Sequence, residues 1–61
     1  MAATLYSCVL KIDAETLDRI REYTTAHNLR LTVNTRDSKD LPYWVVVWGT
    51  RLELNEFNRY F

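Results

Sequence analysis

Cysteine, histidine, glycine and proline each occur only once in this chain of 61 residues. A single cysteine, Cys8, forms no internal disulfide, and a single histidine, His27, leaves the chain without the thiolate and imidazole ligands of a structural zinc site. Because Gly49 is the only glycine, there is no glycine-rich loop for a phosphate group. We therefore expect a domain that holds no metal and no cofactor.

The chain also lacks an excess of charge and any long apolar run. Its eight basic and eight acidic residues cancel, so no overall field draws it to nucleic acid or anionic lipid. No apolar run approaches the ~20 residues needed to cross a bilayer, and the N-terminus lacks the basic-then-apolar pattern of a secretory signal. These absences predict a cytoplasmic protein without a membrane partner.

The composition that is present is that of a folded protein. Hydrophobic residues make up 48% and charged residues 26%, far from the balance of a disordered chain. We expect residues 1–61 to form a single small α+β domain. On folding, a chain of this length buries only about 60% of the surface that its unfolded form exposes. Association with itself or with a partner is therefore the remaining way to gain stability.

Periodicity predicts a strand, a helix and a second strand in the first 35 residues. Apolar residues recur with period two from Thr4 to Ile12 and again from Leu29 to Thr35. Between them, three- and four-residue spacing predicts an amphipathic helix. Asp13 is suited to cap its start, and Asn28 tolerates the left-handed backbone that ends helices.

The second half of the sequence predicts a third strand and a short helix. Residues 36–42 are polar and indicate a connection between antiparallel strands, and residues 43–48 are apolar on both faces. Thr50 and Glu53 match a capping box, and Leu54, Phe57 and Phe61 follow helical spacing. A brief strand over residues 51–54 is the alternative.

The predicted order is therefore β-α-β-β-α. A right-handed crossover through the first helix makes the first two strands parallel, and the third strand, antiparallel to both, fits between them. This is a two-layer sandwich with a three-stranded sheet, equivalent to a ferredoxin-like fold without its last strand.

The candidates for catalysis or metal binding each have a simpler structural explanation. His27 near a helix end suits the helix dipole, and Cys8 falls on the buried face of a strand, where a small apolar role is the commoner one. Asp37 and Asp40 flank a turn that offers too few oxygen ligands for a hard cation. The sequence therefore predicts that the protein is not an enzyme.

Aromatic residues are the main positive feature, eight in all, and they are concentrated in the last third of the chain. Alternation places Tyr43 on one face of the third strand and Trp44 and Trp48 on the other. The face that carries Trp44 and Trp48 is either covered by the C-terminal helix as a second core layer or exposed to a partner. Trp, Tyr and Arg dominate binding hot spots. The residues predicted to bind a partner are Tyr43, Trp44, Trp48, Arg36, Arg51, Tyr60 and Phe61.

These observations favour a protein–protein interaction module that docks on a larger protein or on its own copy as a homodimer. Small regulators and inhibitors, including those carried by phages, share this size class. The alternative is a domain that binds single-stranded nucleic acid, stacking bases on the aromatic rings with Arg30, Arg36 and Lys39 near the phosphates. The zero net charge counts against this alternative.

Overall fold

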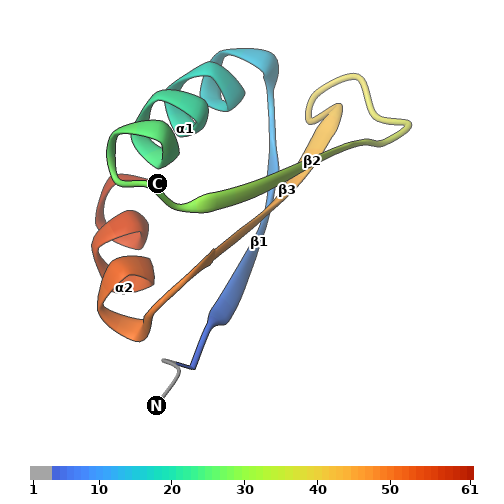
Figure 1. Cartoon of the computed structure of the whole chain (residues 1–61). Coiled ribbons are helices and arrows are strands. Elements are labelled where there is room, and N and C mark those ends of the chain that lie inside the picture. Colours follow the sequence, from blue (N-terminus) through green and yellow to red (C-terminus); the bar gives the residue numbers. More distant parts are fainter. Residues whose placement is uncertain (1–3) are drawn as a thin grey trace.

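The computed structural model describes residues 4–61 and shows, in that range, three strands and two helices in the predicted order (Figure 1). The elements are β1 (Tyr6–Ile12), α1 (Ala14–Ala26), β2 (Arg30–Thr35), β3 (Tyr43–Gly49) and α2 (Arg51–Tyr60). The predicted α+β fold class is confirmed. The strands begin or end one or two residues from the predicted limits, since β1 starts at Tyr6 and not at Thr4.

The sheet has the strand order β1-β3-β2. β3 pairs antiparallel with both neighbours, so β1 and β2 run parallel on either side of it. Val45, for example, lies opposite Leu10 on one side and Val33 on the other. The predicted position of the third strand between the first two is confirmed.

The helices begin and end where local side-chain chemistry predicts. The Asp13 carboxylate accepts a 2.8 Å hydrogen bond from the Thr16 backbone N–H, and Asn28 ends the turn after α1 with a φ of 57°. The Thr50 hydroxyl accepts from the Glu53 N–H, and the Glu53 carboxylate accepts from the Thr50 N–H at 2.8 Å. Residues 51–54 are thus helical, and the alternative strand is wrong.

Gly49 allows α2 to start close against the sheet. A Cβ atom at this position would lie 3.2 Å from Glu53 Cβ and 3.3 Å from Leu29 Cδ2. Its φ is not positive, so the residue is needed for space and not for backbone freedom.

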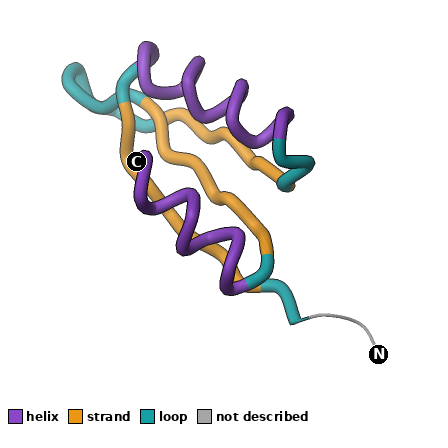
Figure 2. Tube along the Cα trace, turned by 90° about the vertical axis from the view of Figure 1, so that its left-hand side faces the viewer, coloured by secondary structure: helices purple, strands orange, loops and turns teal. Residues whose placement is uncertain are grey.

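Both helices cover the same face of the sheet, and the core lies between the two layers (Figures 1 and 2). Each helix turns an apolar stripe toward the strands, and Thr24, buried among them, donates its hydroxyl to the Ile20 carbonyl at 2.9 Å. The buried apolar residues are Ile12, Leu17, Ile20, Val45, Val47, Leu54 and Phe57. Since both helices occupy one side, the opposite side of the sheet has no second layer within residues 4–61.

Candidate binding surface

The uncovered side of the sheet presents nine side chains in three rows, and we call it the open face. Residues that pair directly across antiparallel strands point to the same side, and side chains alternate along each strand. The pairing therefore assigns each row one residue from β1, one from β3 and one from β2. The rows are Ser7, Trp48 and Arg30; Val9, Val46 and Thr32; and Lys11, Trp44 and Asn34.

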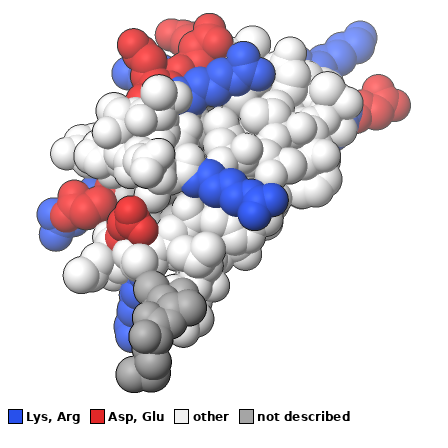
Figure 3. All heavy atoms as spheres, in the orientation of Figure 1, with Lys and Arg blue, Asp and Glu red and all other residues white. Residues whose placement is uncertain are grey.

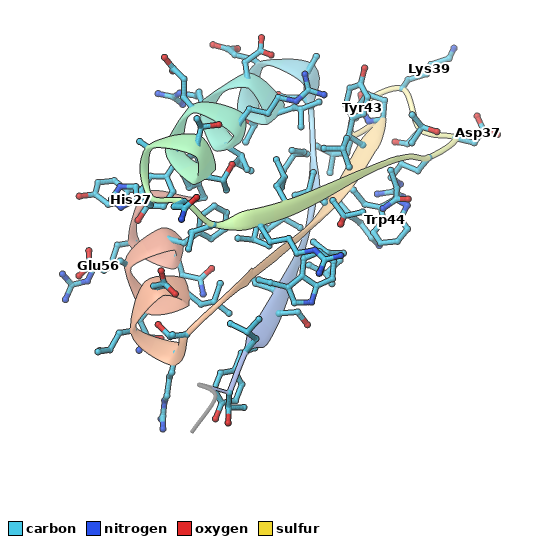
Figure 4. All side chains as sticks on the ribbon, in the orientation of Figure 1. His27, Asp37, Lys39, Tyr43, Trp44 and Glu56 are labelled. Carbon is cyan, nitrogen blue, oxygen red and sulfur yellow. The ribbon has the colours of Figure 1, made fainter. Side chains whose placement is uncertain are left out.

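The two tryptophans are the largest side chains of the open face. Four residues apart on one strand, they are separated by about 13 Å of backbone, with Val46 between them. In Figure 4, Trp44 projects away from the helices, whereas His27 and Glu56 lie on the helix side. Both tryptophans are half-buried although no helix covers them. Neighbouring side chains shield them: the Arg30 guanidinium carbon lies 5.1 Å from the Trp48 ring centre.

The charges of the open face are all positive. Lys11 and Arg30 lie on it, whereas the eight acidic residues belong to α1 and its cap, α2, and the connection between β2 and β3. Figure 3, seen from the β2 side, shows acidic side chains over the helices and at the tip of the connection. The face thus combines apolar and aromatic surface with two cations.

The structure divides the seven predicted binding residues between different surfaces. Trp44 and Trp48 lie together on the open face, whereas Tyr43 points to the helix side and packs against the core. Arg36 follows β2, where its backbone N–H donates to the Pro42 carbonyl at 2.8 Å. The remaining three are on or next to α2: Arg51 is exposed in its first turn, and Tyr60 and Phe61 are at its C-terminal end.

Tyr60 and Phe61 contribute to an aromatic cluster in the helix layer. Its centre is Tyr23, which stacks on His27 with ring centres 4.1 Å apart and lies 5.6 Å from Tyr60 and from Phe61. Burial raises the pKa of the Tyr23 phenol, and the charge of Glu56 adds to the effect. A groove of about 460 Å³ runs along this cluster between α1 and the end of α2.

This groove was not predicted from the sequence. The four-residue spacings of Tyr23 with His27 and of Phe57 with Phe61 were the available signal. They show that each pair shares a helix face, but the meeting of the two pairs depends on how α1 and α2 are placed on the sheet.

The residues considered for catalysis lie in separate parts of the molecule. His27 is exposed at the end of α1, and Cys8 is half-buried in β1, with its Sγ 3.6 Å from Asn58 Oδ1. Asp37 and Asp40 lie in the exposed connection. Within residues 4–61 no three potential metal ligands come together, and none of the helices there has the length and hydropathy needed to cross a membrane.

Comparison of the chain with protein-family models, curated proteins and solved structures gave no match.

Proposed function

We propose that this chain is a non-enzymatic interaction module that docks on a larger protein through the open face. The observation that carries the proposal is the position of Trp44 and Trp48, which lie on either side of Val46 along the central strand, on the side that neither helix covers. Trp and Arg are the residue types that most often dominate binding energy, and Arg30 stacks on one of the two rings.

The charges of the open face indicate the chemistry of the partner. Lys11 and Arg30 lie at opposite corners, on different edge strands, with the tryptophans and Val46 between them. A complementary protein surface has an apolar centre with acidic groups near these two corners, which favours encounter and fixes the orientation. The size of the chain suits a regulator or inhibitor that acts by occupying such a surface.

Single-stranded nucleic acid is the second candidate, and the absence of any carboxylate from the open face favours it. Aromatic rings next to cations are the elements of a base-stacking platform. Two features favour a protein instead: Arg30 already covers part of Trp48, and the face has only two cations for a phosphate backbone.

The test is affinity capture with three baits, the wild-type chain, Trp44→Ala and Trp48→Ala, each with and without nuclease. We expect the wild-type chain to capture a protein whether or not nuclease is present. The affinity measured for that protein should fall by about 2 kcal/mol, roughly 30-fold, in at least one tryptophan variant. Circular dichroism should show that both variants fold, because neither ring is part of the buried core.

Tyr60→Ala is the matched control, since Tyr60 is an aromatic residue 69% exposed on the helix side. If both tryptophan variants bind as the wild type does and Tyr60→Ala loses binding, the binding surface is on the helix side and not on the open face. Capture that nuclease abolishes, with affinity falling steeply as salt rises, would instead establish the nucleic-acid function.

A further inference from the structure

The outer edge of β1 is unpaired in the part of the chain that the structure describes. β1 and β2 form the two edges of the sheet, and an edge strand presents free N–H and C=O groups to which another strand can bind. Natural edge strands are usually protected by charge, proline or a bulge. β1 carries one charge, Lys11, and no proline.

The two edges differ in exposed apolar surface. Around β1, Leu5, Tyr6 and Val9 are 61%, 51% and 58% exposed. β2 instead turns Arg30, Thr32 and Asn34 to the open face, all of them polar. Burial of a second strand against β1 therefore removes apolar surface from water, whereas the same event at β2 removes mainly polar groups.

We propose that two copies of this chain pair through β1, antiparallel, about a twofold axis that runs midway between the two copies of Val9. We call this an axis through Val9. The two three-stranded sheets then form one continuous sheet of six strands. Val9 lies opposite Val9 of the second copy, Cys8 opposite Leu10, Ser7 opposite Lys11, and Tyr6 opposite Ile12.

The length of β1 selects this register. Opposite residues in an antiparallel pair must point to the same side of the sheet, whereas neighbouring residues on one strand point to opposite sides. The residue at the twofold axis must therefore lie opposite its own copy and not opposite the copy of its neighbour. An axis through Val9 pairs all seven residues of β1, whereas an axis through Cys8 or Leu10 pairs only five residues of the strand. In any of these registers both helix layers stay on the same side of the joined sheet, so the number of paired residues is what distinguishes them.

Side-chain chemistry agrees with the same register. Each Lys11 lies opposite the uncharged Ser7, so no like charges face each other across the pair. At the centre, the two Val9 side chains bury one another, and these are the most exposed apolar groups within the strand. Tyr6 meets Ile12, which extends the apolar row on the helix side.

The topology leaves this position vacant for a strand of the required direction. α2 follows β3 and packs over β1, as the contact between Asn58 and Cys8 shows. A right-handed crossover through α2 would bring a further strand, parallel to β3, to the outer edge of β1. β1 of a second copy, antiparallel to β1, has this direction, and no strand within residues 4–61 occupies the place.

The decisive measurement is the mass of the 61-residue chain in solution by light scattering or sedimentation over a wide concentration range. We expect the wild type to change from 7.3 kDa to twice that value as concentration rises. In Val9→Lys two lysines face each other at the axis, so we expect the monomer mass at concentrations where the wild type is a dimer. Thr32→Lys is the matched control because Thr32 occupies the same row on the opposite edge, and it should dimerise like the wild type.

A wild type that stays monomeric throughout, or a Val9→Lys variant that dimerises like the wild type, would overturn the proposal. So would a dimer that Trp44→Ala abolishes while Val9→Lys preserves it, since the copies would then meet through the open face. Because these measurements need no external partner, they give an answer whether or not the proposed docking function holds.

Cross-linking tests the register. Opposite residues of an antiparallel pair have Cα atoms about 4.5–5.5 Å apart, within the range of a disulfide. Under mild oxidation, Val9→Cys in a Cys8→Ser background should form a covalent dimer, whereas native Cys8, opposite Leu10, should do so much more slowly. Fast cross-linking of Cys8 with none at position 9 would exclude an axis through Val9.

Discussion

Asp13 shows how one side chain fixes the start of a helix and links its stability to pH. The carboxylate accepts the Thr16 N–H, one of the donors that the first turn of α1 leaves without a partner. Hydrogen bonding by Thr16 holds the pKa of the Asp13 carboxyl below its ordinary value of 3.8, and the Thr16 side chain contributes more to this than the Thr16 backbone. The folded state therefore favours the charged form.

The sign of the resulting pH effect follows from this lowered pKa. The contribution of Asp13 is complete above pH 3.8 and is lost as the pH falls through the lower pKa of the folded state. Asn caps helices as well as Asp but does not titrate. We expect Asp13→Asn to weaken the pH dependence of thermal unfolding below pH 3.8.

Asp18→Asn is the control for this prediction, because it removes a carboxylate from the exposed side of the same helix and leaves the cap intact. Thermal unfolding followed by circular dichroism across acidic pH compares the two variants. An unchanged slope in Asp13→Asn would show that other carboxylates account for the acid sensitivity.

At the scale of the element, α2 is held by one apolar stripe. Leu54 and Phe57 are buried against the sheet, whereas Leu52, in the same helix, is 78% exposed. A ten-residue helix is too short to be stable alone, so its formation depends on this packing.

Phe57 is the residue whose loss should most affect α2, because its ring is fully buried. We expect Phe57→Ala to cost about 3–5 kcal/mol, which is comparable to the whole stability of about 3–9 kcal/mol for a chain of this length. Phe57→Leu should keep the fold at a cost of about 1–2 kcal/mol. Leu52→Ala, on the exposed side, should change the free energy of unfolding in urea by less than about 0.5 kcal/mol. Equal losses at positions 52 and 57 would contradict this orientation of α2.

The elements were predictable because their signals are local. The Asp13 cap, the left-handed Asn28 and the capping box of Thr50 and Glu53 depend on residues a few positions apart, and each was confirmed. The side of the sheet that α2 covers was not predictable, because β3 is apolar on both faces. Val45 is buried in the core and Val46 lies on the open face, yet the two are the same residue type, so the sequence does not tell which of them faces the helices.

For the candidate surface, sequence could select residue types but not their grouping. Alternation correctly separated Trp44 and Trp48 from Tyr43. Their grouping with Tyr60 and Phe61 could not be judged, since the distance of α2 from each face depends on tertiary packing. The structure assigns these last two residues to the cluster around Tyr23.

On the scale of the whole molecule, every other element packs on β3. This strand is hydrogen-bonded along both edges, and it carries the fully buried Val45 and Val47. Opening it requires both ladders and the core to separate, whereas β1 and β2 can each loosen from an edge.

We therefore expect the amides of Val45 and Val47 to exchange with solvent more slowly than any others in the chain, at a rate set by global unfolding. Hydrogen exchange followed by NMR measures this directly. Exchange at the middle of β3 that is faster than in α1 would mean that the helix layer, and not the sheet, is the last part to open.

The central position of β3 also determines when the protein acquires a structure during its synthesis. A ribosome delivers the chain from its N-terminus, yet the two strands made first, β1 and β2, have no hydrogen bonds to each other and share a partner that begins at Tyr43. A product of translation that stops before Tyr43 contains two strands and no sheet. We expect such truncated chains to stay accessible to proteases, because neither strand has a partner to hold it.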